Sequence, residues 1–231
     1  MNLIKSPLKN IALSLALLAS SLAHSQSPPQ TTSTPVASSL QALDAKITQA
    51  FEQNKCSCAS VIIIENGTPV MHKSFGMADI SNQKKVDAQT IFRAGSISKS
   101  IIGIALMMLV EEGKLDLTTK LVDIAPEIKF TNQWEATHPL REEHLLEHTT
   151  GFDSLSFRQM RIGKADASLR EAIALYGPYV SRWQPGNYYA YCDSATIIAA
   201  YIVEKITGQT WADFTQKRIF LPLGISTANW D

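Results

Sequence analysis

The chain has 231 residues, of which 45% are hydrophobic and 18% charged, a composition typical of a globular protein that buries a substantial core. A chain of this length forms one or two domains. Its formal net charge is zero and it contains no basic block, so the sequence argues against nucleic acid as a partner.

The first 25 residues have the pattern of an export signal. Lys5 and Lys9 form a short positive region, residues 11–19 are apolar, and Ala23-His24-Ser25 supplies the small residues that a signal peptidase reads. The apolar part is shorter than the roughly 20 residues that a membrane span needs. We therefore expect cleavage after residue 25, no other membrane contact, and a periplasmic or secreted protein.

A linker and a hairpin are predicted next. Residues 26–39 are rich in Ser, Thr, Pro and Gln and predict a disordered linker, whereas residues 40–54 have apolar side chains at helical spacing. Ser60–Glu65 is β-branched and predicts a strand. Asn66-Gly67 is a strong hairpin signal, and Pro69–Phe75 is the expected return strand.

The stretch from Ile91 to Gly113 is the centre of the chain. It predicts a helix that is apolar on nearly all sides, buried within a domain and ended by Gly113, with Met107 and Met108 as core residues. Ser96 and Lys99 lie three residues apart at its start, so on a helix their side chains share a face. A serine hydroxyl needs a neighbouring base to become a nucleophile, and a lysine with a lowered pKa can be that base.

The Ser-x-x-Lys pattern by itself is weak, because the chain contains it three times. Ser6–Lys9 lies in the export signal and Ser81–Lys84 lies in a polar loop. Ser96–Lys99 alone joins a strand-like entry to an apolar helix, where a lysine has no structural purpose. The context therefore selects Ser96 as the candidate nucleophile.

The rest of the chain predicts short helices and turns, in this order: a connection at 115–124, a helix at 140–148, weakly patterned surface structure with helix at 152–176, a turn at 183–187, an extended piece at 188–191, and helices at 194–206 and 211–220. Gly208 is expected to end the first of the last two helices, and Thr210 to cap the second. Trp211 and Trp230 are expected to be packing residues.

A metal site is the alternative chemistry. His144 and His148, with Glu147 between them, match the His-x-x-Glu-His pattern of some zinc peptidases, in which both histidines share a helix face. No third acidic ligand is evident apart from Glu204. We expect neither a metal nor a cofactor.

Several segments, in this order, resemble the serine β-lactamase-like superfamily, which includes class C β-lactamases, D-alanyl-D-alanine carboxypeptidases and related esterases: FRAGSISKS, EEGKLDLTTKLVDIAPE, HLLEHTTGF, PGNYYAYCDS, VEKITGQTWADF and IFLPLGI. The resemblance covers residues 40–231 and implies an α+β fold with an antiparallel sheet flanked by helices plus a helical subdomain. It implies that Ser96 is acylated, that Lys99 assists, and that Tyr191 helps to move the proton.

The chain departs from the family pattern at two points. Asp193 stands where the family has Asn; it either faces the site, keeping Lys99 protonated and leaving more of the proton transfer to Tyr191, or only caps the following helix. The neighbouring Cys192 is expected to be a small buried hydrophobe. The Lys- or His-x-Gly strand of the family, which would supply one oxyanion-hole amide, is absent, so we interpret the chain as truncated and lacking C-terminal strands.

The sequence therefore predicts an exported serine hydrolase that forms an acyl-enzyme. Its substrate is a small molecule or peptide: a β-lactam, a D-Ala-ended peptide, an ester or an amide. A non-catalytic binding or regulatory member of the same fold is the alternative, favoured by Asp193 and the missing strand.

Overall fold

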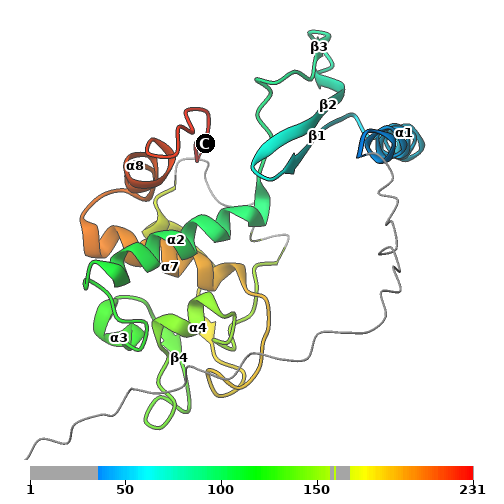
Figure 1. Cartoon of the computed structure of the whole chain (residues 1–231). Coiled ribbons are helices and arrows are strands. Elements are labelled where there is room, and N and C mark those ends of the chain that lie inside the picture. The colour runs from blue at the N-terminus through cyan, green and yellow to red at the C-terminus, as the bar shows by residue number, and fades with distance from the viewer. Residues whose placement is uncertain (1–35, 157–158, 160–166, 231) are drawn as a thin grey trace, which may run out of the picture. The chain divides into compact units, whose positions relative to one another are not determined.

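A computed structural model describes residues 36–156, 159 and 167–230 of the protein (Figure 1). The chain divides into two units, Met1–Thr90 and Ile91–Asp231, which we describe separately. The predicted export signal and most of the predicted linker lie outside the described residues. None of the helices in the described ranges combines the length and apolar character that a membrane span requires.

The first unit begins with helix α1, Val36–Asn54. It starts four residues before the predicted position at Leu40, so residues 36–39 of the predicted linker are helical. The ring of Phe51 on α1 stacks on that of Phe75 with a centroid distance of 4.8 Å. This contact fixes α1 against the strand that carries Phe75, since stacked aromatic pairs add to the energy of simple burial.

The predicted hairpin is confirmed. Strands β1 (Cys58–Glu65) and β2 (Thr68–Asp79) pair antiparallel, and β2 pairs with the two-residue strand β3 (Lys84–Lys85). The turn residues Asn66 and Gly67 have φ of +49° and +76°. Both residues accept such angles readily, which is why Asn-Gly favours a tight hairpin.

The second unit contains, in chain order, a 3₁₀ turn (Gly95–Ile97), α2 (Ser98–Glu111), α3 (Leu121–Ile124), β4 (Phe130–Thr131), α4 (Glu142–Leu146), α6 (Leu169–Tyr176), β5 (Tyr179–Val180), α7 (Asp193–Thr207), α8 (Trp211–Thr215) and a π-helical turn (Gln216–Phe220). Strands β4 and β5 pair in parallel. Gly113 and Gly208 both have φ of +67° after α2 and α7, so both predicted helix ends are confirmed. The predicted α+β class, with an antiparallel sheet and a helical part, is confirmed as well.

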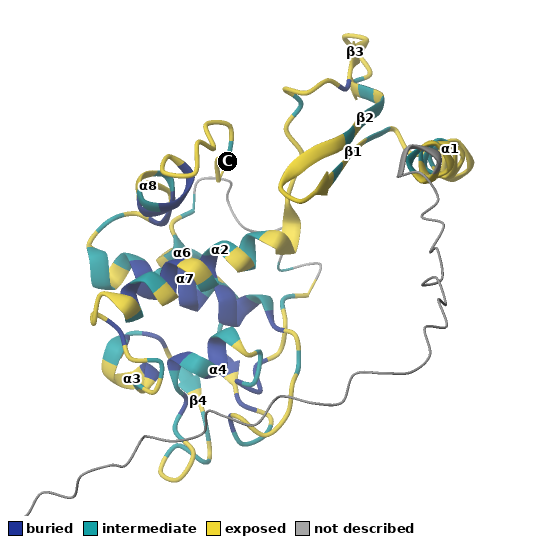
Figure 2. Cartoon of the chain, viewed as in Figure 1, coloured by how far each residue is buried: buried dark blue, intermediate teal, exposed yellow. Residues whose placement is uncertain are grey.

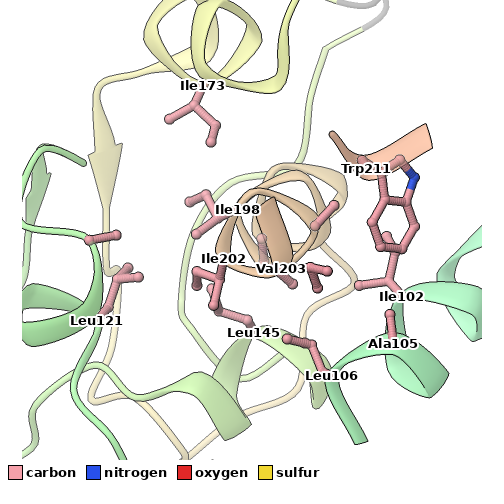
Figure 3. Close-up of a cluster of buried hydrophobic side chains, with 14 of the residues drawn as sticks. Ile102, Ala105, Leu106, Leu121, Leu145, Ile173, Ile198, Ile202, Val203 and Trp211 are labelled. Atoms are coloured by element: carbon pink, nitrogen blue, oxygen red, sulfur yellow. The ribbon is translucent and has the colours of Figure 1, made fainter. Parts of the chain in front are cut away.

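Helix α7 is the centre of the core, because it contacts α2, α4, α6 and α8. Its side chains Ile198, Ile202 and Val203 are fully buried, and Leu106 of α2 and Leu145 of α4 pack in the same cluster (Figure 3). Full burial of each such side chain contributes roughly 1.5–3 kcal/mol. This packing holds the beginnings of α2 and α7 in fixed positions.

Helix α2 is buried on one side only, which corrects the prediction of an all-round buried helix. Ala105, Leu106 and Leu109 are inaccessible to solvent, whereas Ile104 and Met107 are 45% and 48% exposed. In Figure 2 the buried residues, drawn in dark blue, gather along α7 and its neighbours. The second unit covers one face of α2, so Met107 is wrongly predicted as a core residue, while the half-buried Met108 packs against the core.

A buried carboxyl group lies in α4. Glu142 is fully buried, and neither of its carboxyl oxygens has a hydrogen-bond partner within the described ranges. Desolvation raises its pKa to about 8 from an ordinary value of 4.5. The side chain is therefore mostly protonated near neutral pH, and its ionisation opposes folding.

We expect the wild-type protein to lose stability as the pH rises through this window. Between 4.5 and about 8 the folded state holds a proton that the unfolded chain has released, so the free energy of unfolding falls with increasing pH. The slope contributed by this group is about 1.4 kcal/mol per pH unit. Urea unfolding at several pH values should show that Glu142→Gln removes this slope. Glu111→Gln, at an exposed position of α2, is the control, and an unchanged slope in Glu142→Gln would contradict the prediction.

Candidate active site

Ser96 lies in the 3₁₀ turn that leads into α2, one turn before the helix proper. The chain enters this turn through Gly95, whose φ of +55° suits glycine. Ser96 is solvent-exposed, and Lys99, in the first turn of α2, directs its Nζ to 3.4 Å from Ser96 Oγ. The predicted Ser-Lys pair is therefore formed, with the serine at an accessible position.

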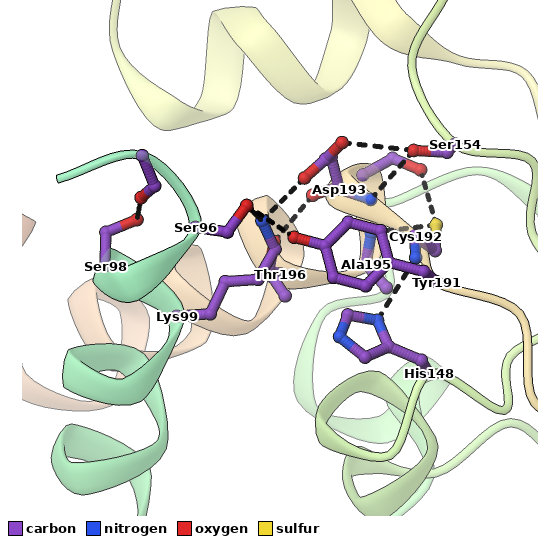
Figure 4. A network of polar contacts seen from close by, with 12 residues as sticks. Ser96, Ser98, Lys99, His148, Ser154, Tyr191, Cys192, Asp193, Ala195 and Thr196 are labelled. Carbon is purple, nitrogen blue, oxygen red and sulfur yellow. Dashed lines mark hydrogen bonds and ion pairs between the residues drawn. The ribbon is translucent and has the colours of Figure 1, made fainter. Parts of the chain in front are cut away.

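The segment before α7 completes a cluster around Ser96 (Figure 4). The Tyr191 hydroxyl donates to Ser96 Oγ at 2.7 Å, and Lys99 Nζ lies 4.8 Å from the centroid of the Tyr191 ring. Asp193 Oδ1 accepts from Lys99 Nζ at 2.6 Å. The structure thus brings together all four residues that the sequence proposed for the site.

Asp193 faces the site and is not the helix cap. The N-cap of α7 is Cys192, whose buried Sγ accepts from the amide of Ala195 at 3.4 Å. Asp193 is the first residue of the helix, and its Oδ2 accepts from Ser154 Oγ at 3.1 Å. The expectation that Cys192 is a buried small side chain is confirmed, and the capping role considered for Asp193 belongs to Cys192 instead.

The contact with Asp193 sets the charge of Lys99. Desolvation favours the neutral amine, but the hydrogen bond that Lys99 donates to Asp193 and the contact with Tyr191 outweigh it, and the pKa of Lys99 is raised. Lys99 is therefore an ammonium group at neutral pH. It can therefore stabilise negative charge that develops on Ser96 Oγ. This arrangement corresponds to the alternative in which Asp193 faces the site, keeps Lys99 protonated and leaves more of the proton transfer to Tyr191.

His148 supports the segment 190–192, which carries Tyr191. Its Nδ1 accepts from the amide of Cys192 at 3.2 Å, its carbonyl oxygen accepts from the amide of Ala190 at 2.9 Å, and its ring lies 4.6 Å from the Tyr191 ring. Burial, together with the charge of Lys99, lowers the pKa of His148 below 6.5. Sequence reasoning did not identify this role, because it considered His148 only as a possible metal ligand or as part of the predicted helix at 140–148.

The zinc pattern fails on local geometry. Helix α4 ends at Leu146, and His148 follows it with φ of +58°, so the two histidines do not share one helix face. His144 Nδ1 accepts from the amide of Arg141, and Glu204 Oε1 accepts from the amide of Trp211. Within the described ranges, no three His, Cys, Asp or Glu side chains are grouped as a metal site would require.

A pocket of about 700 Å³ opens beside Ser96. Its charged lining residues are Lys99, Asp193 and Glu204. Much of the remaining wall is apolar and comes from Ile102, Leu155, Leu169, Ile197, Trp211 and Trp230. The two indole rings lie 5.2 Å apart, so Trp211 and Trp230 pack against each other, as expected, and also form part of this wall.

The sequence model of the beta-lactamase family matches residues 43–231. The chain belongs to the beta-lactamase family. Among curated relatives, penicillin-binding protein 4 of Amycolatopsis lactamdurans is 29% identical over 161 residues, which are 70% of this chain and 40% of that protein. Esterase EstB of Burkholderia gladioli is 27% identical over 196 residues, 79% of this chain and 49% of that protein.

A solved structure supports the same fold. An octameric penicillin-binding protein homologue from Pyrococcus abyssi superposes with a TM-score of 0.70 at 27% identity, over 81% of this chain and 43% of that chain. The chain thus spans less than half the length of each of these relatives. The activities in the names of these relatives refer to those proteins.

Proposed function

We propose that this beta-lactamase family chain is a serine hydrolase that acts on an ester, amide or β-lactam carbonyl through an acyl-enzyme on Ser96. The observation that supports this most strongly is the convergence of a tyrosine hydroxyl and an ammonium group on one exposed serine hydroxyl, at 2.7 Å and 3.4 Å. A serine that serves only the fold has no need of both partners.

The proposed proton route runs through Tyr191. Ser96 Oγ forms a bond to the carbonyl carbon as its proton passes to the Tyr191 oxygen, and the phenol passes its own proton to the leaving group as the bond to that group breaks. The phenol is therefore neutral before and after the step. Lys99, held as a cation by Asp193, stabilises charge on the reacting oxygen. Water then releases the acyl group by the reverse route, and the products are a carboxylic acid and free Ser96.

Intact-mass spectrometry after exposure to a fluorophosphonate tests the assignment, and a penicillin serves as a second reagent. We expect one fluorophosphonate adduct per chain, located on Ser96 by peptide mapping. The seryl adduct is stable because the phosphonyl group resists hydrolysis. Folded protein that carries no adduct, or an adduct at another residue, would contradict the proposal.

We further expect His148 to set the acid limit of activity. Neutral His148 accepts from the Cys192 amide, and protonation removes this acceptor and adds a second cation near Lys99; Asp193 is the acidic group that faces it. Because the pKa of His148 is lowered, this loss should begin only below about pH 6.5.

The variant His148→Asn tests whether titration of His148 causes the loss of activity at acid pH. Asn tolerates the left-handed backbone and keeps an acceptor that does not titrate. Near neutral pH its acylation rate should lie within about tenfold of the wild-type rate. Below about pH 6.5 its acylation rate should no longer fall as the pH decreases. His148→Phe keeps a ring and removes the acceptor, so its acylation should fall at every pH. If the acylation rate of His148→Asn still falls at acid pH, the titrating group is a residue other than His148.

A further inference from the structure

The charge of the pocket beside Ser96 carries an inference about substrate class. Lys99 is its one cation within the described ranges, and Asp193 holds that cation at 2.6 Å. Lys99 and Asp193 are 19% and 24% exposed, so the carboxylate remains accessible from the pocket. An incoming anion therefore meets an ion pair that is already neutral.

The second acid of the pocket adds to this effect. Glu204 receives a hydrogen bond from the amide of Trp211, and no cation contacts its carboxylate among the described residues. The three charged groups sum to one negative charge. The wall around them is formed by the apolar side chains named above, including the paired Trp211 and Trp230. Such a wall favours an apolar substituent, which leaves water on entering it.

We propose that the substrates of Ser96 are uncharged carboxylic esters with an apolar acyl chain, and that Asp193 disfavours acyl donors that carry a carboxylate. Penicillins and D-Ala-ended peptides both carry one. This inference rests on the proposed acyl-enzyme function and narrows it. Asp193 acts here on specificity, through the charge that a substrate meets beside the nucleophile.

Three p-nitrophenyl esters of similar length test the inference: the valerate, which is neutral, the glutarate monoester, which is anionic, and 4-trimethylammoniobutyrate, which is cationic. The leaving group is the same in all three, and hydrolysis by Ser96→Ala is subtracted as background. For wild type we expect kcat/KM for the valerate to exceed that for the glutarate by about tenfold or more, the factor that roughly 1.4 kcal/mol of charge repulsion produces. The cationic ester should not be disfavoured, and added salt should narrow the ratio because it screens exposed charges.

Asp193→Asn should narrow the valerate-to-glutarate ratio by about tenfold, since it removes one negative charge and leaves Lys99 unpaired. If Asp193 only positions Lys99, kcat/KM would change by the same factor for all three esters. The matched control is Asp123→Asn, at an exposed position of α3 outside the pocket, which should leave the ratio unchanged.

The outcomes separate the two proposals. Folded wild-type protein that hydrolyses none of the esters and takes no fluorophosphonate would overturn the proposed function and this inference with it. If wild type hydrolyses the glutarate monoester with the same kcat/KM as the valerate, the inference alone is overturned. The same holds if the valerate-to-glutarate ratio of kcat/KM does not change in Asp193→Asn. If Asp193→Asn is inactive, the wild-type ratio and its salt dependence decide.

Discussion

Ser96→Ala should abolish fluorophosphonate labelling and reduce ester turnover by about a thousandfold or more, because it removes the proposed nucleophile. Ser96 is exposed and lies outside α2 proper, so alanine creates no cavity and the fold should be unaffected. Intact mass and kcat for p-nitrophenyl valerate measure the two effects on one preparation, and thermal unfolding shows that the variant is folded.

The matched control for this variant is Ser100→Ala. Ser100 is an exposed serine of α2, four residues beyond Ser96. It should retain the adduct and turn over the ester at the wild-type rate. An adduct that survives in Ser96→Ala would disprove the assignment of the nucleophile, however much turnover is lost.

Tyr191→Phe should reduce turnover by about 10²–10⁴-fold, the range that a positioned proton-transfer group contributes. The phenol oxygen lies 2.7 Å from Ser96 Oγ, whereas the ring packs against the His148 ring at a centroid distance of 4.6 Å and is retained in phenylalanine. The change therefore removes the proton route and leaves the packing in place.

The leaving group provides a diagnostic for Tyr191. Departure of p-nitrophenolate depends only weakly on the proton that Tyr191 delivers, whereas an alkoxide leaves only as it is protonated. Tyr191→Phe should therefore impair an ethyl ester more than the p-nitrophenyl ester of the same acid. Tyr188→Phe is the control, since Tyr188 is 65% exposed and contacts the edge of Trp183. Equal losses on both esters in Tyr191→Phe would exclude a role in leaving-group protonation.

The sequence predicted those features of the fold that depend on local patterns. Asn66-Gly67 predicted the hairpin, and Gly113 and Gly208 predicted two helix ends, because each signal reflects a backbone angle that few residues accept. Ser96 was selected by its place at the start of an apolar helix and Tyr191 by the family resemblance, and the structure brings the two side chains within hydrogen-bonding distance. A serine and a tyrosine 95 positions apart in the sequence do not by themselves indicate a contact.

The features that sequence reasoning left open or missed depend on tertiary contacts. Asp193 is a better helix cap than cysteine by residue preference, yet Cys192 occupies the capping position and frees Asp193 for Lys99. The His-x-x-Glu-His pattern presumes a helix that continues to His148, and α4 ends at Leu146 instead. Exposure of Met107 was missed because a hydrophobic run does not say how many sides a neighbouring element covers.

The separation of the site residues along the chain has a consequence for folding. The contacts of Ser96 with Tyr191 and of Lys99 with Asp193 join residues 95 and 94 positions apart. Such contacts form only after the intervening chain has closed into a large loop, and they carry the entropic cost of that closure. Reactivity of the serine should therefore appear late during refolding, after helical structure has formed, and it reports when α7 has docked against α2.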